Sequence, residues 1–483
     1  MPLRKLPVLF ITGLLLLLAT ISESFAFQIG TDQSALSGLR ATLISDSLQS
    51  YLKYKAGTIA FTEVNVIDGL GGPVRKNQTV IIENGHFSTI GDDGTIEIPS
   101  HALQVNLRGK TMIPGLVGMH NHLHFPQFPE IGEASAKLYL AAGVTTIQTC
   151  GAASAHEELK LSSRISNGQF PGPEIIPSAP FITGPGGNPN MIIPRDEAHL
   201  RDTIQYWIDK GVRWFKVYRN TKPEDLKTAI EVAHANNARV RGHLCSITFK
   251  EATEMGIDGI EHGLNSTSDF RTNKTFGQCD GGREYIDELQ INSEEVIALQ
   301  QQMIDKGVFM TSTLSVFEAS VAQRAYADAR ALKAMSPYLK GLYEERRKAF
   351  DKEMKDETRL KRLKRMMAFE YQYFKMGGLL CSGVDAGRHV LPGFGDQRNF
   401  ELFLEAGFST EEAIQVMTSN GARALNRNDI GSISSGKRAS FVILNGDLTA
   451  NSKVIEKVET VFKNGLGFDP QIILNEMQGK FGL

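Results

Sequence analysis

Short apolar runs alternate with helical segments through the middle of the chain. The first run, residues 113–124, passes from apolar residues into a cluster of histidines. Seven further runs typical of buried strands follow it, at residues 144–149, 174–178, 212–218, 239–243, 259–262, 308–312 and 378–385. Segments with helical periodicity separate most of them, which predicts parallel βαβ units. Eight such units predict an α/β fold, a closed (β/α)8 TIM barrel.

The pattern differs on both sides of this region. Residues 57–113 contain short β-rich runs separated by turn pairs such as Asn84-Gly85, a strong hairpin signal between apolar runs. β-rich patterning returns at residues 440–444 and 457–462. We expect these later strands to complete the earlier sheet, so that the barrel is inserted into a small composite β-sandwich domain.

This interpretation divides the chain into six parts. They are a signal peptide (1–26), an N-terminal leader of helical character (27–56), the first part of the β-sandwich (57–113), the barrel (114–428), the second part of the sandwich (429–468) and a C-terminal tail (469–483). Between its seventh and eighth strands the barrel carries a long insertion, residues 317–376, rich in helix formers and charged residues. We expect a solvated helix face there. A lid over the site or a subunit contact is the alternative.

The first 26 residues have the pattern of an export signal. Arg4 and Lys5 precede the apolar run 8–19, and Ser24-Phe25-Ala26 fits a small-x-small cleavage site. The run is short for a membrane span of about 20 residues. We therefore expect cleavage after Ala26 and a secreted or periplasmic protein that is not stably inserted in a membrane.

Composition narrows the function classes further. A net charge of −2 over 483 residues, without a basic patch, argues against a nucleic-acid partner. The four cysteines are widely spaced and form no disulfide or zinc-binding pattern. Cys150, Cys245 and Cys381 lie in or beside apolar runs and are expected to be buried free thiols, although an oxidising compartment would permit one bridge. An assembly of identical subunits is compatible with the sequence.

Residues able to bind metals stand at or just past predicted strand ends, where TIM barrels place their active sites. In a strand, side chains two residues apart share a face, so His120 and His122 point into one space. Neutral imidazole is the commonest zinc ligand in proteins. The other members of the set follow later strands: Lys216, His243, His262 and Asp385.

These six side chains suffice for two divalent metal ions, expected to be zinc. Asp385 would ligate one ion and accept a proton from a water between the two. A lysine buried near two cations loses its proton readily and can react with CO2, so Lys216 is expected to be N6-carboxylated and to bridge the ions. Metals about 3.5–4 Å apart activate such a water and polarise a scissile carbonyl. The imidazole ligands are expected to be His120 and His122 for the first ion, and His243 and His262 for the second.

At these residues the chain resembles the metal-dependent amidohydrolase superfamily, in its binuclear, carboxylated-lysine branch. The resemblance extends over roughly residues 57–468 and implies the barrel with its composite β-sandwich. One departure is Gly118, where the superfamily often has an aspartate that is not a ligand. The matching segments are Pro114-Gly115-Leu116 with His120 and His122, Phe215-Lys216-Val217-Tyr218, Gly242-His243, Ile260-Glu261-His262-Gly263 and Ser382-Gly383-Val384-Asp385-Ala386-Gly387.

Within the superfamily the pattern is most similar to imidazolonepropionase-like proteins and to Xaa-Pro and Xaa-Arg dipeptidases. This branch implies that Tyr218 contacts the substrate near its scissile carbonyl. The alternative is a tyrosine that only packs. True imidazolonepropionases and aminohydrolase deaminases use one metal and lack the bridging lysine, so Lys216 argues against both.

Three further residues are candidates for substrate contact. His124 shares the strand face of His120 and could replace a ligand in another register, but we expect it to line the pocket. His389 follows Asp385 and is expected near the same pocket. Arg388 could bind a substrate carboxylate through its two-pronged guanidinium, or it is an ordinary loop arginine.

The function that these observations predict is hydrolysis of an amide C–N bond by a metal-bridged hydroxide. The substrate would be a small amide or peptide: a dipeptide, an N-acyl amino acid or a cyclic amide. A lactonase or phosphotriesterase-like hydrolase on the same metals is a second interpretation. A metal-dependent binding protein without turnover is a third, which the presence of Asp385 argues against.

Overall fold

The computed structural model describes residues 44–124, 131–324, 327–387 and 389–482. Strands from both ends of the chain form one nine-stranded sheet in the order β1-β17-β16-β15-β6-β2-β3-β4, with β5 paired to β2. The bounds are β1 (Leu52–Tyr54), β2 (Ile59–Val66), β3 (Arg75–Glu83), β4 (His86–Asp92), β5 (Leu103–Asn106), β6 (Thr111–Pro114), β15 (Phe441–Leu444), β16 (Val458–Lys463) and β17 (Leu466–Phe468). The expected completion of the N-terminal sheet is observed, because β15 pairs antiparallel with β6.

The Asn-Gly hairpin is confirmed. Asn84 and Gly85 connect β3 to β4 with φ values of 51° and 77°. Two consecutive residues with positive φ form the turn whose twist matches antiparallel strands. Apolar side chains from the two parts of the sheet share one core, in which the rings of Phe441 and Phe462 stack at 4.4 Å and Phe61 meets both edge-on.

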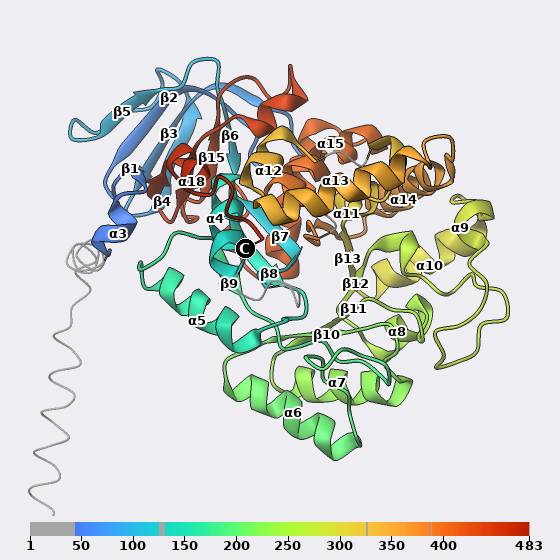
Figure 1. Cartoon of the computed structure of the whole chain (residues 1–483). Coiled ribbons are helices and arrows are strands. Elements are labelled where there is room, and N and C mark those ends of the chain that lie inside the picture. Colours follow the sequence, from blue (N-terminus) through green and yellow to red (C-terminus); the bar gives the residue numbers. More distant parts are fainter. Residues whose placement is uncertain (1–43, 125–130, 325–326, 388, 483) are drawn as a thin grey trace, which may run out of the picture. The chain divides into compact units, whose positions relative to one another are not determined.

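All eight strands predicted for the central region are present. They form a three-stranded parallel sheet of β7 (Leu116–Asn121), β8 (Val144–Thr149) and β9 (Glu174–Ile176), and a five-stranded parallel sheet of β10 (Trp214–Val217), β11 (Arg239–Gly242), β12 (Gly259–Glu261), β13 (Phe309–Ser312) and β14 (Leu380–Ser382). Their side chains are buried on both faces, apart from the ends of β9 and β11. The fold is thus a mixed α/β fold, as predicted (Figure 1).

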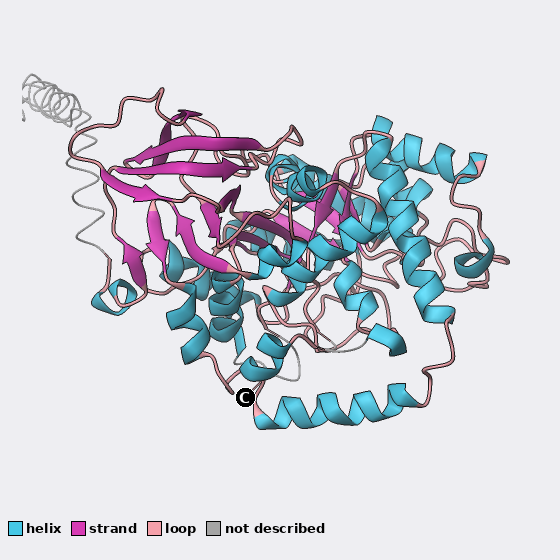
Figure 2. Cartoon of the chain, turned by 90° about the horizontal axis from the view of Figure 1, so that it is seen from above, coloured by secondary structure: helices cyan, strands magenta, loops and turns pink. Residues whose placement is uncertain are grey.

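Helices lie between most of these strands along the chain (Figure 2). Those following β7 to β12 are α4 (Gly132–Ala141), α5 (Ala155–Ser166), α6 (Glu197–Asp209), α7 (Pro223–Ala235), α8 (Phe249–Met255), η3 (Gly263–Asn265), α9 (Tyr285–Glu288) and α10 (Glu294–Asp305). Those following β14 are α15 (Phe394–Ala406), α16 (Thr410–Met417), α17 (Ser419–Ala424), η5 (Ser452–Glu456) and α18 (Pro470–Glu476). The predicted start at Thr410 is confirmed, with Ser409 and Glu412 forming a capping box.

The predicted insertion is helical. It holds the end of α11 (Leu314–Glu318), then η4 (Ala322–Arg324), α12 (Ala329–Ala334), α13 (Pro337–Asp351) and α14 (Thr358–Lys375). Helix α14 carries a polar face and buries Leu363, Met366 and Phe369. It therefore has both a solvated side and a packed side.

The predicted signal peptide and its cleavage site after Ala26 lie outside the described residues. The described end of the leader is only partly helical, because the short helix α3 (Asp46–Gln49) is followed by β1, which pairs with β17. In the part of the chain that is described, no helix has both the length and the apolar character needed to cross a membrane.

A buried carboxyl on α14 makes the stability of the fold depend on pH. Glu370 accepts a hydrogen bond from the Ser312 hydroxyl at 2.6 Å, and its Oε1 has no partner among the described residues. Burial raises the pKa of Glu370 to about 8. Its folded pKa exceeds its unfolded pKa, so the folded state binds the extra proton and its stability falls as pH rises.

We expect wild-type unfolding free energy to fall by about 1.4 kcal/mol per pH unit between pH 5 and pH 8 through this group. Glu370→Gln should remove that slope, because the amide stays neutral. Urea unfolding at several pH values checks this, with the exposed Glu344→Gln as the control. Equal slopes in Glu370→Gln and wild type would contradict the assignment.

Candidate metal centre

Six side chains predicted from strand ends meet in one cavity. Its volume is about 520 Å³, within the range of small-molecule sites. His120 lies in β7 and Lys216 in β10, while the remaining four follow β7, β11, β12 and β14. The cavity is lined by all six: His120, His122, Lys216, His243, His262 and Asp385.

The polar atoms of these groups lie close together. Lys216 Nζ is 3.0 Å from His120 Nε2, and Asp385 Oδ1 is 3.0 Å from His122 Nε2 and 3.5 Å from His120 Nε2. The His262 ring centre lies 4.6 Å from that of His120, and 4.5 Å from that of His243, which follows the neighbouring strand β11. The six residues thus form one continuous polar cluster inside an apolar core.

The tautomer of His120 follows from its neighbours. Its Nδ1 is 2.5 Å from Glu261 Oε2, and the other carboxylate oxygen of Glu261 accepts a bond from Arg241. Burial, and after it the charge of Lys216, hold the pKa of His120 well below its ordinary value, so the ring carries one proton. That proton lies on Nδ1, and the Nδ1–H group donates a hydrogen bond to Glu261. The Nε2 lone pair therefore faces Lys216 and Asp385.

Arg241 and Glu261 are both fully buried beneath this cluster. Besides its bond to Glu261, Arg241 donates to Gln148 Oε1 at 2.6 Å and Thr311 Oγ1 at 2.6 Å. Burying an ion pair is tolerable only when each partner is hydrogen bonded. Glu261 meets the requirements of a carboxylate that orients a metal-binding histidine through the nitrogen that does not bind.

The pKa values of His243, His262 and Asp385 also favour the binding of cations. Burial lowers the pKa of His243 to about 3 and holds that of His262 well below its ordinary value. Burial alone would raise the pKa of Asp385, but His120, a hydrogen bond from His122 and the charge of Lys216 outweigh it and lower that pKa. His120, His243 and His262 are therefore neutral imidazoles, and Asp385 is an ionised carboxylate.

Two of these residues have left-handed backbone. His262 has φ 67° and Asp385 has φ 46°, each just past its strand. Such conformations are uncommon for residues other than glycine and occur at functional sites. The Nδ1 of His262 bonds to Thr313 Oγ1 at 2.8 Å, which fixes the ring.

This donor set fits divalent metal ions. Ligand atoms of His120, His262 and Asp385 all lie within 4.8 Å of one another. Imidazole nitrogen and carboxylate oxygen are the donors that zinc accepts. Lys216 is 2% exposed and points its amine into the same group.

Of the four residues predicted to contact the substrate, only Tyr218 is found in the wall of this cavity among the described residues. Tyr218 lines the cavity, with its ring centre 5.0 Å from that of His243. His124 is buried beside Gly132 and does not line the described cavity. His389 lines a separate cavity of about 560 Å³ beside Tyr343. Arg388 lies outside the described residues.

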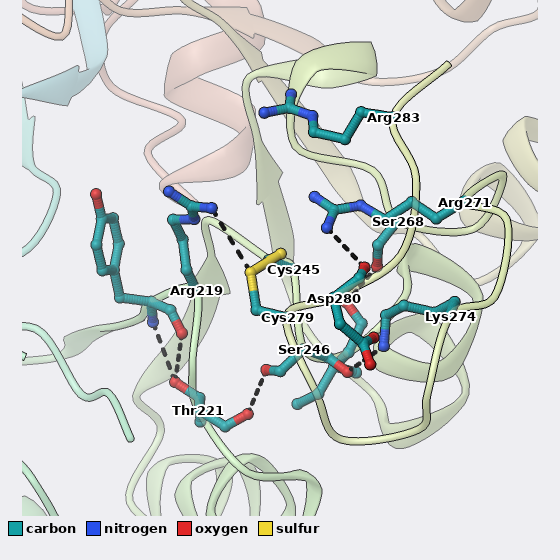
Figure 3. The surroundings of a disulfide bond; sticks show 12 residues. Arg219, Thr221, Cys245, Ser246, Ser268, Arg271, Lys274, Cys279, Asp280 and Arg283 are labelled. Carbon is teal, nitrogen blue, oxygen red and sulfur yellow. Dashed lines mark hydrogen bonds between the residues drawn. A yellow bond between two sulfur atoms is a disulfide. The ribbon is translucent and has the colours of Figure 1, made fainter. Parts of the chain in front are cut away.

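One cysteine prediction was wrong. Cys150 and Cys381 are buried free thiols as expected, but Cys245 forms a disulfide with Cys279 (Figure 3). The reason is that Cys245 lies beyond the end of β11, where the loop after β12 returns and brings Cys279 within reach. Sequence spacing alone could not reveal that return.

Sequence reasoning also missed residues of the cavity wall. Arg219, Arg271 and Arg283 line it, as do Arg359 and Arg362 from α14. Only Arg219 had a local signal, since it directly follows Tyr218 at a strand end. The insertion thus contributes to the wall of the candidate site.

Comparisons with known proteins found one sequence match and several similar solved structures. Residues 394–466 match the model of the amidohydrolase family. No curated protein matches the sequence. Bottromycin amidohydrolase has a similar structure, with TM-score 0.67 and 17% identity over 91% of this chain and 94% of that one.

Two further solved structures are similar. A Xaa-Pro dipeptidase with methionine bound in its active site has TM-score 0.64 and 18% identity, covering 86% of this chain and 100% of its own. A Bifidobacterium longum protein provisionally named a prolidase has TM-score 0.65 and 21% identity, covering 87% and 99%. At these identities the structures establish a common fold.

The sequence match and the common fold confirm the resemblance to the amidohydrolase superfamily. The match of residues 394–466 supports the predicted class of enzyme, a hydrolase acting on carbon–nitrogen bonds.

Arg241→Met should destabilise the fold by about 3–5 kcal/mol, because it leaves the Glu261 charge buried without its partner. The double variant with Glu261→Gln should regain part of that loss, since the unpaired charge is then absent. Urea unfolding at pH 7 measures both. A loss below about 1 kcal/mol, or no recovery in the double variant, would contradict the role given to this pair.

Proposed function

We propose that the protein hydrolyses the amide C–N bond of a dipeptide or N-acyl amino acid at a centre of two divalent metal ions. The observation that carries this proposal is the convergence of His120, Lys216 and Asp385 with three further histidines, from five strands of the chain, on one buried cavity.

The two parallel sheets would be parts of one eight-stranded barrel. The backbone N–H of Asp385 donates to His120 O at 2.8 Å, so the end of β14 lies against β7. A Cβ on Gly383 would lie 2.3 Å from the His120 nitrogen, so only glycine permits that approach. On the other side, Ile182 after β9 bonds to Lys216 of β10 at 2.8 Å. These contacts support a closed ring with the candidate site at its carboxyl end.

Each side chain has a role in the proposed centre. Lys216, as its carbamate, would help to hold the ions, together with the carboxylate of Asp385. Bound metal ions supply an activated water at neutral pH and polarise the carbonyl. Zinc fits the nitrogen and oxygen donors. His120 and His122 would hold one ion, and His243 and His262 the other.

Side chains of the protein would carry out the proton transfers and hold the substrate. Asp385, kept ionised at neutral pH, can receive the proton of the attacking water at a carboxylate oxygen and return it to the leaving amine. Tyr218 lies beside His243 and would contact the substrate near its scissile carbonyl. Phe181 and Phe317 line the same cavity and give part of its wall an apolar surface.

The choice of substrate is supported by the cavity and by the similar structures. About 520 Å³ accommodates a dipeptide-sized molecule. One similar structure is a Xaa-Pro dipeptidase and another an amidohydrolase. We propose export to an oxidising compartment, a proposal that the Cys245–Cys279 disulfide supports.

Lys216→Ala should lower bound metal from two ions per chain to one or none and reduce kcat/KM at least about 100-fold. The reason is the loss of the bridging group. Elemental analysis and amide hydrolysis assays measure the two effects, and the exposed Lys210→Ala is the control. Full metal and full activity in Lys216→Ala would refute the centre.

The bond that is cleaved can be tested with one panel of dipeptides, N-acyl amino acids, lactones and aryl phosphate esters on the zinc-loaded protein. We expect the amides to have the highest kcat/KM. A preference for lactones or phosphate esters would reassign the chemistry, and no turnover with metal bound would favour a binding protein.

A further inference from the structure

The cavity wall has an uneven charge. Five arginines line it, but Asp385 is its only acidic residue in the described structure. Two of the arginines are neutralised: Arg362 by Asp287, in a two-pronged pair at 2.7 and 2.6 Å, and Arg359 by Glu353 at 3.1 Å. The other three have no described carboxylate oxygen within 4.0 Å: Arg219, Arg271 and Arg283.

These three guanidinium groups retain unused donors. Arg271 donates to the Asp280 carbonyl at 2.9 Å, while its buried Nε has no partner in the described structure. Arg283 donates to the Asn265 carbonyl at 3.0 Å, and Arg219 lies 3.6 Å from the sulfur of Cys279. None of these contacts neutralises a charge.

The three charges also act on one another. Burial lowers the pKa of Arg271; Tyr285 opposes this effect, while repulsion from Arg283 and Arg219 adds to it. Carboxylates bind guanidinium in a two-pronged geometry. An anion placed among the three would satisfy the free donors and relieve this repulsion.

The disulfide fixes the segment that carries two of them. Cys279 lies between Arg271 and Arg283 in the loop after β12, and its partner Cys245 lies two residues after His243. Figure 3 shows the three arginine side chains around the disulfide. The covalent bond therefore ties the arginine-bearing loop to the wall that carries a proposed metal ligand.

We propose that Arg219, Arg271 and Arg283 form a subsite for carboxylates of the substrate, so that the preferred substrates are dipeptides or N-acyl amino acids ending in aspartate or glutamate. This inference rests on the proposed amide hydrolysis. One terminal carboxylate occupies one guanidinium fork, whereas three unpaired forks around one cavity suit a leaving amino acid with two carboxylates.

The test compares N-acetyl-glutamate with N-acetyl-glutamine on the zinc-loaded full chain. We expect kcat/KM for the glutamate substrate to be roughly 10- to 100-fold higher, from charge-assisted hydrogen bonds. In Arg219→Gln with Arg283→Gln the two substrates should become nearly equal, through a raised KM for the acidic one. Both arginines are exposed, so these replacements leave the core intact.

Arg362→Gln is the matched control, because Arg362 lines the same cavity but is already paired with Asp287. It should leave the ratio between the two substrates unchanged. Turnover of both substrates with no preference, or a preference that survives loss of Arg219 and Arg283, would overturn the subsite.

Calorimetry with L-glutamate and L-glutamine separates this inference from the function on which it rests. If glutamate binds more tightly, and the double variant abolishes the difference while no amide is cleaved, the proposed function fails and the subsite stands. If amides are cleaved and both amino acids bind alike, the function stands and the subsite fails.

Discussion

A guanidinium and a carboxylate, both withdrawn from water, lie beneath the cluster of histidines. Arg241 and Glu261 would each be costly to bury alone, and each is stable there because the other neutralises it. The second oxygen of Glu261 accepts a hydrogen bond from His120 Nδ1–H, so the charge pair decides which ring nitrogen keeps its lone pair free. The geometry of the cavity floor thus depends on an interaction inside the core, where hydrogen bonds from neighbouring strands hold Arg241 in place.

The cavity above Arg241 and Glu261 is built from two kinds of element, the ends of the parallel strands and the segments that connect them. The strand ends set the positions of the imidazoles, of Lys216 and of Asp385, and the left-handed backbone of His262 and Asp385 turns the chain at the cavity. The walls come from elements outside the strands, namely helix α14 and the loop after β12. In the proposed centre, the core would determine which metal ions are held, and the cavity walls would determine which substrate fits.

Much of this architecture could be predicted from the sequence, because it depends on local pattern. Apolar runs predicted the parallel strands, Asn84-Gly85 predicted the hairpin, and the strand-end rule led to His243 and Asp385. The predicted closure of the barrel was not observed as strand pairing, because the eight central strands form two separate parallel sheets.

The features that escaped prediction depend on how distant segments return in space. The pairing of Cys245 with Cys279 needs the path of a long loop, and the unpaired state of Arg271 needs knowledge of which acids lie nearby. Arg241 was missed for another reason. A charged residue inside a strand gives no sign of whether it faces solvent or a buried partner, and its partner Glu261 is separated from it by a helix.

The Cys245–Cys279 bond has a consequence for how the protein responds to redox conditions. It joins residues that are 34 apart in the sequence, and the segment that it closes contains β12 and His262. Reduction would free the loop that carries Arg271 from the end of β11, whereas His262 would keep its bond to Thr313. The redox state of the surroundings would therefore act on the arginine-bearing wall of the cavity rather than on the parallel strands beneath it.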